Sequence, residues 1–170
     1  MNISAVLLVL ISVTTTTYAI TGLYQAIMAN LKKVPAGKPA YQSSLYTNNS
    51  KFAASKAVDG NTNTNMDTGS CFHTETNRTN WWYVDLQQTY RQIRKIELYS
   101  RTDCCAERNK MISVQIGTSL DNMRQVKYWS SQIGGHEKIT FTHDQVARYV
   151  KLVHTANTYF HMCELEVYHQ

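Results

Sequence analysis

The segment RTDCCAER (101–108) concentrates residues that could do chemistry. Arg101 and Arg108 carry only hydrogen-bond donors, arranged in a planar fork that stays protonated at physiological pH. Two guanidinium groups repel each other at close range, so a shared site needs a carboxylate between them, and Asp103 is placed to supply it. Taken alone, these residues are more typical of a surface ion-pair group that includes Asp103 and Glu107.

The chain contains four cysteines, and two of them are adjacent. Four cysteines allow three disulfide connectivities, and their spacing does not choose among them. Adjacent cysteines usually bond to other partners, because a disulfide between neighbours closes a small ring and strains the peptide between them. The four are Cys71, Cys104, Cys105 and Cys163.

Short stretches of alternating apolar and polar residues recur from Val34 onward. Ile112, Val114 and Ile116 give the clearest case. Polar turn segments separate the stretches, and neither a long helical pattern nor an internal repeat is visible in this region. The pattern predicts an all-β chain folded as an antiparallel β-sandwich. The expected strands include 96–98, 112–116, 139–141, 149–153 and 165–168, and turn segments lie at 59–70 and 130–137.

The first residues indicate the compartment. Residues 1–19, MNISAVLLVLISVTTTTYA, hold an apolar run too short to span a bilayer, followed by small residues suited to cleavage, so we predict a signal peptide. They contain no Lys or Arg, which leaves a signal anchor as the alternative. Residues 20–33 follow as an N-terminal extension, either a short amphipathic helix or a loose arm. Secretion makes the cysteines disulfide candidates, and sequons at Asn48 and Asn77 agree with that route.

Length and charge exclude several classes of partner. The 170 residues fit the size of a single domain. The formal charge is +5, from 17 Lys and Arg against 12 Asp and Glu, and the basic residues are scattered in ones and twos. Without a dense basic run, neither nucleic acid nor a membrane surface is an expected partner.

Four segments taken together resemble the F-type lectins, or fucolectins. RTDCCAER (101–108) is the most specific part, because it matches the family's R-x-D-x4-[R/K] sugar motif and holds adjacent cysteines within it. The resemblance implies an eight-stranded jelly roll of the discoidin-like type over residues 34–170. The remaining parts are GKPAYQSS (37–44), AVDGNTN with GSCFHT (57–63, 69–74), NWWYVDL (80–86), and ARYVKLV with CELEVY (147–153, 163–168).

The resemblance also implies a ligand, terminal L-fucose, and the residues that bind it. His73 would donate to the axial 4-hydroxyl, and Arg101 and Arg108 would meet the ring oxygen and the 3-hydroxyl. Asp103 would hold both arginine forks in position. The sugar's C6 methyl needs an apolar pocket, for which the candidates are Leu45, Tyr46, Met66 and Phe72.

In the family's pattern the cysteines pair as Cys104–Cys105 and Cys71–Cys163. The first pair would present its sulfur atoms to the C–H face of the sugar. The stretch between His73 and Arg101 (74–100) is one residue longer than the family usually has. A single added residue inside a strand turns every later side chain to the other face unless a bulge or a turn absorbs it. We expect a bulge or a turn between residues 90 and 98 to absorb the added residue.

The resemblance further implies a structural calcium ion near the sugar site. Calcium takes six to eight oxygen ligands from carboxylates, amides and carbonyls, and VDGNTN (58–63) is rich in such oxygens. Taken alone, DGN is an ordinary turn. The positions that match the family's ligands are Lys56 (carbonyl), Asp59, Asn61, Ser70, Cys163 (carbonyl) and Glu164.

Two other functions compete with a lectin. A glycosidase needs two carboxylates flanking the scissile bond, and Asp103 and Glu107 lie among arginines that would keep both ionised, so we predict no enzyme. A discoidin-like module that binds phospholipid or protein would have the same fold. The candidate loops carry donors and cysteines instead of large apolar residues. We therefore predict a secreted lectin that meets membranes only through fucosylated glycans, as a homo-oligomer in agglutination or innate recognition.

Overall fold

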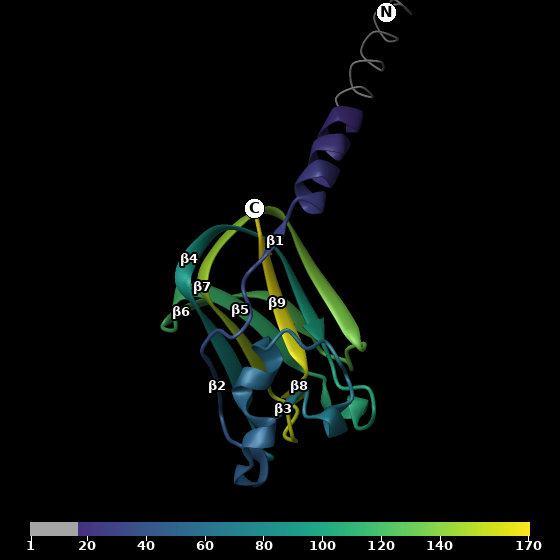
Figure 1. Ribbon diagram of the computed structural model, residues 1–170, viewed down its shortest axis with the longest axis vertical. Helices are drawn as coiled ribbons and strands as arrows, with labels where there is room; N and C mark the ends of the chain where they lie inside the picture. Colours follow the sequence, from purple (N-terminus) through teal and green to yellow (C-terminus); the bar gives the residue numbers. More distant parts are fainter. Residues whose placement is uncertain (1–16) are drawn as a thin grey trace, which may run out of the picture. The chain divides into compact units, whose positions relative to one another are not determined.

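The computed structural model describes residues 17–170, which fall into two units. The first unit runs up to Lys32 and includes Gln170, and the second is the compact unit Lys33–His169. Residues 17–29 are helical, so the extension predicted at 20–33 contains a helix (Figure 1). Most of the predicted signal peptide, residues 1–16, lies outside the described residues. Across residues 17–170, no helix is long and apolar enough to cross a membrane.

The unit Lys33–His169 consists of antiparallel strands, which confirms the predicted all-β fold. Residues 17–170 hold a seven-stranded sheet in the order β1-β9-β4-β7-β5-β6, with β2 paired to β4, and a two-stranded sheet, β3-β8. The strands are β1 (Lys32–Lys33), β2 (Ala40–Gln42), β3 (Phe72–His73), β4 (Asn80–Tyr99), β5 (Ile112–Ser119), β6 (Asn122–Trp129), β7 (His136–His154), β8 (His161–Met162) and β9 (Glu164–His169).

Two long strands, β4 and β7, each serve in both layers of the sandwich (Figure 1). In one layer, residues 80–85 of β4 pair with residues 149–154 of β7, and β2, β5 and β6 extend the sheet to either side. In the other layer, residues 95–99 of β4 lie between β9 and residues 136–140 of β7. The number of strands therefore differs from the expected eight, because β4 and β7 each run through both layers as one continuous strand.

The bend in β4 is a run of irregular pairing. Its register with β7 shifts between Asp85 and Tyr90, again before Ile93, and again before Lys95. Gln87, inside the bend, has a φ of 66°. Bulges of this kind add residues without turning the later side chains to the wrong face. The bend overlaps the segment 90–98, where we expected the extra residue before Arg101 to be absorbed.

The alternating apolar residues fill the space between the two layers. Ile112, Val114 and Ile116 of β5 are at most 2% exposed, as their spacing predicted. The indole of Trp82 is fully buried and donates to the Ala54 carbonyl at 2.9 Å. The core is formed by these residues together with Val84, Ile96, Leu98, Ile139, Val150, Leu152, Leu165 and Val167.

Connections at one end of the sandwich carry the predicted site residues. The short pair β3-β8 lies at this end, at the bottom of Figure 1, together with single-turn helices. These are η1 (Tyr46–Asn48), η2 (Ser50–Phe52), η3 (Ala54–Val58), η4 (Met66–Thr68) and η5 (Ala106–Arg108).

Candidate functional site

His73 ends β3, opposite His161 of β8, and is 2% exposed. Its Nδ1 lies 2.8 Å from the Thr74 carbonyl oxygen. Burial, together with the positive charges of Arg101 and Arg108, lowers the pKa of His73 to about 4. The ring is therefore neutral near pH 7. A carbonyl only accepts, so the proton sits on Nδ1 and Nε2 keeps a lone pair. His73 thus offers a ligand an acceptor, whereas the sequence led us to expect a donor.

Aromatic rings surround the His73 imidazole. The Tyr46 ring centroid is 4.3 Å from it, and the Tyr159 centroid is 5.2 Å away. Tyr46 and Tyr159 also meet edge to face at 5.6 Å. Tyr46 was a predicted member of the apolar pocket, and Tyr159 was not predicted. Their packing fixes the orientation of the imidazole and supplies apolar surface next to it.

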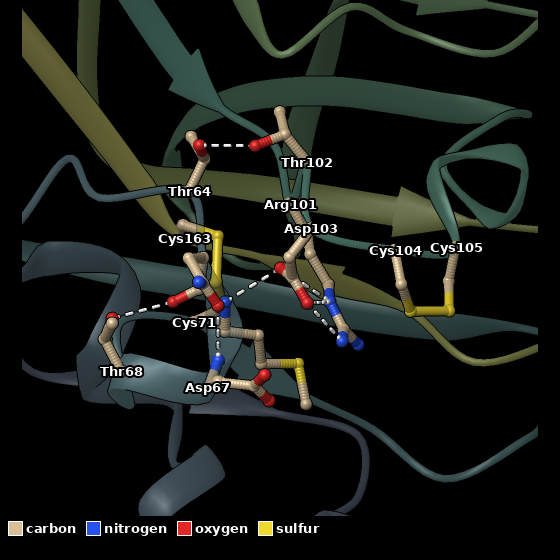
Figure 2. Close-up of polar contacts among 12 residues, drawn as sticks. Thr64, Asp67, Thr68, Cys71, Arg101, Thr102, Asp103, Cys104, Cys105 and Cys163 are labelled. Carbon is tan, nitrogen blue, oxygen red and sulfur yellow. Dashed lines mark hydrogen bonds and ion pairs between the residues drawn. A yellow bond between two sulfur atoms is a disulfide. The ribbon is translucent and has the colours of Figure 1, made fainter.

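Arg101 and Asp103 form a two-pronged ion pair, drawn in Figure 2. Arg101 Nη2 donates to Asp103 Oδ2 at 2.6 Å, and Nε lies 3.0 and 3.1 Å from the two carboxylate oxygens. The backbone N–H of Met66 also donates to Asp103 Oδ1, at 2.9 Å. The Arg101 guanidinium holds the pKa of Asp103 below its ordinary value, and the Met66 N–H contributes in the same direction. Asp103 is therefore ionised, and its two oxygens are fixed by two separate loops.

The groups that contact Arg108 differ from those that we predicted. Asp103 does not bridge the two arginines, because within residues 17–170 its ion pair is with Arg101 alone. The guanidinium carbon of Arg108 lies 4.9 Å from the Tyr159 ring centroid, and its Nε is 3.9 Å from an oxygen of the exposed Glu107. The aromatic face thus takes the place that we assigned to Asp103.

The loop between Arg101 and Arg108 is pinned where it ends. Asn109 is fully buried, and its amide donates to the Ser100 hydroxyl at 2.6 Å and to the His161 carbonyl at 2.9 Å. The His154 ring donates from Nε2 to the Arg108 carbonyl at 2.8 Å. Asn109 follows the RTDCCAER motif directly, and this buried amide was not predicted. It closes the loop onto β8, next to His73.

Both disulfides form as the family pattern implies. The bonds are Cys71–Cys163 and Cys104–Cys105, and all four cysteines are thereby used. Figure 2 shows Cys104 and Cys105 on the segment that follows Arg101 and Asp103. Cys105 has a φ of 60° and caps η5, the turn that carries Arg108. The adjacent pair therefore shapes the chain between the two arginines.

The other candidates for the methyl pocket are less favourable. Phe72 is fully buried and packs between Trp82 and Phe160 in the core, so it lies away from any ligand surface. Met66 is 6% exposed and packs against the Cys71–Cys163 disulfide. Leu45 is half-buried directly before η1. Phe72 is excluded by its burial, while Leu45 stays a candidate directly before the half-buried Tyr46.

The predicted calcium site contains a buried carboxylate, Glu164, that uses only one of its two oxygens among the described residues. Glu164 is 2% exposed, and its Oε2 has no hydrogen-bond partner among the described residues. Oε1 accepts from the Gly60 N–H at 3.2 Å. Burial, together with the negative charge of Asp59, raises the pKa of Glu164 to about 8. A cation would stabilise the charged form of such a carboxylate, so Glu164 and Asp59 fit a calcium ion.

The remaining predicted ligands offer neutral oxygens around this pair. The Asn61 N–H donates to Asp59 Oδ1 at 2.9 Å, and the Ser70 hydroxyl donates to the Asn65 carbonyl at 2.9 Å while keeping its lone pairs. Lys56 lies on η3, which contacts β9, and Cys163 precedes Glu164 directly. Within residues 17–170, no three His, Cys, Asp or Glu side chains gather as a metal-binding group. A site here must therefore draw on amide, hydroxyl and carbonyl oxygens.

Known proteins share this architecture. The family model described as "NedA-like, galactose-binding domain", of the F5/F8 type C group, matches residues 56–152. The fucolectin of Anguilla anguilla is 35% identical over 120 residues, which are 67% of this chain and 75% of that protein. The chain spans 61% to 65% of the length of four fucolectins of Anguilla japonica.

Two solved structures show the same fold. The f-lectin (fucolectin) from striped bass serum, Morone saxatilis, has a TM-score of 0.75 and 34% identity, covering 82% of this chain and 49% of its own. The lectin domain of lectinolysin, complexed with Lewis B antigen, has a TM-score of 0.71 and 30% identity, covering 82% and 97%. This chain therefore belongs to the F5/F8 type C, galactose-binding-like domains and, among them, to the fucolectins, or F-type lectins.

Proposed function

We propose that this protein is a lectin that binds terminal L-fucose on glycans through His73, Arg101 and Arg108. One observation carries the proposal: the Tyr159 ring lies 5.2 Å from the His73 ring and 4.9 Å from the Arg108 guanidinium carbon. The charges of Arg101 and Arg108 also act to lower the pKa of His73. A hydroxyl group donates one hydrogen bond and accepts others. The axial 4-hydroxyl would donate to His73 Nε2 and accept from an arginine, so an acceptor with two cationic donors nearby suits it.

The apolar side of the sugar has its own counterpart. Tyr46 and Tyr159 flank His73, and the half-buried Cys104–Cys105 disulfide follows Arg101 in the loop. A C–H face packs favourably on rings and on sulfur, while donors fix the hydroxyls on the other side. Relatives support this choice of ligand, since the lectin domain of lectinolysin was solved with Lewis B antigen bound.

A calcium ion would serve structure rather than sugar contact. Its ligands would be the carbonyls of Lys56 and Cys163 and the side chains of Asp59, Asn61, Ser70 and Glu164. When bound, the ion would neutralise the buried Glu164 carboxylate. Asp59 and Asn61 belong to the loop that reaches Asp103 through Met66, so the ion would steady the sugar site from outside it.

The same site argues against catalysis. A general acid must hold a proton near neutral pH, and the Arg101 guanidinium keeps the pKa of Asp103 below its ordinary value. Glu107, a second carboxylate near the arginines, is 71% exposed in its side chain. We infer a binding protein without hydrolytic activity. We also infer secretion, since the two disulfides suit an oxidising compartment, the sequon residues Asn48 and Asn77 are exposed, and the striped bass relative is a serum protein.

Homo-oligomerisation would raise avidity for clustered glycans and would suit agglutination or innate recognition. The alternative function, a discoidin-like module for phospholipid or protein, has less support, because the site combines donors, rings and a disulfide. Titration calorimetry with L-fucose tests the proposal, with D-glucose as the matched sugar and anionic lipid vesicles as the rival ligand. We expect the protein to bind L-fucose and to bind neither D-glucose nor the vesicles. Vesicle binding without fucose binding would overturn the assignment.

A further inference from the structure

The loop before Cys71 is braced by a run of side-chain hydrogen bonds. Every second residue accepts from the backbone N–H two positions later: Asp59 from Asn61 at 2.9 Å, Asn61 from Asn63 at 3.1 Å, Asn63 from Asn65 at 2.9 Å and Asn65 from Asp67 at 2.9 Å. Turns of this type hold a backbone in shape without a helix or a strand. The run therefore gives this loop a defined backbone shape.

The last turn of the run, from Asn65 to Asp67, encloses Met66, the residue whose N–H reaches Asp103. Asn65 caps η4 through its side chain, and its carbonyl accepts from the Thr68 hydroxyl at 2.7 Å and from the Ser70 hydroxyl at 2.9 Å. Met66 is the first residue of η4, and the first N–H groups of a helix have no partner within it. The Met66 N–H is thus held in a fixed direction and is free for another acceptor.

Two neighbouring contacts tie this loop to the loop that carries Arg101. The hydroxyls of Thr64 and Thr102 lie 2.7 Å apart, and the Thr102 N–H donates to the Thr64 carbonyl at 3.0 Å. Two residues after Thr64 and one residue after Thr102, the Met66 N–H donates to Asp103 at 2.9 Å. Figure 2 shows the bridge between Thr64 and Thr102. The Asp103 carboxylate therefore has a fixed place before it meets Arg101.

We propose that Met66 is a positioning residue for sugar binding: its backbone N–H sets the Asp103 carboxylate, which in turn sets the plane of the Arg101 guanidinium. The inference rests on the proposed function. Arg101 uses Nε and Nη2 on Asp103, and its Nη1 has no partner among the described residues. A fixed plane directs these unused N–H groups toward the ligand instead of leaving them to rotate.

Proline at position 66 removes this single backbone donor and is compatible with the local backbone. Proline suits the first position of a helix, and it requires an extended residue before it. Asn65 already has a φ of −90° and a ψ of 108°, which is extended. Met66→Pro also removes a buried side chain, so Met66→Ala is the matched control, because it loses the same packing and keeps the N–H.

Calorimetry should find that Met66→Pro binds L-fucose about tenfold more weakly than Met66→Ala, the scale expected for a lost hydrogen bond to a charged group. A second readout separates positioning from folding. Without the N–H, the pKa of Asp103 rises, so Asp103 takes up a proton at a higher pH. On acidification, Met66→Pro alone should therefore lose fucose affinity at a higher pH than the wild type. The melting temperatures of the two variants should agree.

A second pair of variants keeps the test decisive if Met66→Pro does not fold. Thr102→Val removes the hydroxyl bridge to Thr64, and Thr102→Ser keeps it. Weaker fucose binding in Thr102→Val, restored in Thr102→Ser, is the expected result. Equal affinities within each pair, with a wild type that binds fucose, would overturn the positioning role alone. A wild type that does not bind fucose would instead overturn the proposed function.

Discussion

His73 Nδ1 lies 2.8 Å from the carbonyl oxygen of Thr74, the next residue in the chain. This contact assigns the ring proton to Nδ1 and leaves Nε2 as the only polar atom of the ring that a ligand could use. Since burial and both neighbouring arginines lower the pKa of His73, the ring keeps this form over a wide pH range. A neutral acceptor beside two cationic donors is the chemical signature of the site.

Replacing His73 by Phe should remove the acceptor and keep the packing. The Phe ring would still contact Tyr46 and Tyr159, so the fold should survive. One hydrogen bond is worth about 1 to 2 kcal/mol, so the affinity for L-fucose should fall about five- to thirtyfold. Calorimetry with fucose measures the effect, and the melting temperature is the control. An affinity within twofold of the wild type would show that Nε2 does not meet the sugar.

Stability should depend on pH through the same histidine. The pKa of His73 is about 4 in the folded protein and 6.5 ordinarily, so between these values the unfolded chain binds a proton that the folded chain does not. Stability is therefore lost as pH falls from 6.5 to 4, by about 3 kcal/mol. Urea unfolding at several pH values should show a smaller loss for His73→Phe. If the free energy of unfolding falls equally steeply with falling pH in both proteins, the low pKa of His73 is contradicted.

The regular part of the fold could be predicted from the sequence, because alternation directly reports which residues face the core. Ile112, Val114 and Ile116 are buried as their spacing indicates. The length of β4 was not predictable in the same way. Its bend between Asp85 and Lys95 depends on bulges, which interrupt the alternation that marks a strand. The alternation of apolar and polar residues therefore predicted short separate strands, whereas β4 is continuous over Asn80–Tyr99.

The site was predictable where its residues are close in sequence. Arg101 and Asp103 lie two positions apart, and their ion pair forms as expected. Tyr159 and Asn109 were missed, because a single tyrosine or asparagine in a polar segment has no distinguishing spacing. Their roles depend on contacts made through the fold, such as the 4.9 Å approach of Arg108 to the Tyr159 ring.

Arg108 and Tyr159 should act together in fucose binding. Arg108→Ala removes a donor and should abolish measurable binding with an intact fold, since the side chain is partly exposed. Tyr159→Ala removes the ring that supports the guanidinium and should weaken binding about three- to tenfold, the scale of a cation–π contact. Tyr159→Phe keeps the ring and is the matched control. If Tyr159→Ala and Tyr159→Phe bind equally well, the stacking contact has no role in recognition.

Calcium should stabilise the protein through Glu164. The ion would favour the charged carboxylate, whose pKa burial raises to about 8 without it. A chelator should therefore lower the melting temperature, and added calcium should restore it. Glu164→Gln should lose this response, whereas Glu107→Gln, at an exposed carboxylate outside the predicted ligand set, should keep it. A melting temperature that chelation leaves unchanged would refute the calcium site.

We expect the two disulfides to have different effects, one on stability and the other on fucose binding. Cys71–Cys163 joins residues 92 positions apart, and the chain-entropy model assigns such a loop about 4 to 5 kcal/mol, so replacing both residues by Ala should lower the free energy of unfolding on that scale. Cys104–Cys105 closes almost no loop, so its removal should cost little stability. It should nevertheless weaken fucose binding, because Cys105 caps the turn that carries Arg108. Urea unfolding and calorimetry on both double variants measure the contrast. Full affinity without Cys104–Cys105 would show that the adjacent pair neither shapes nor touches the site.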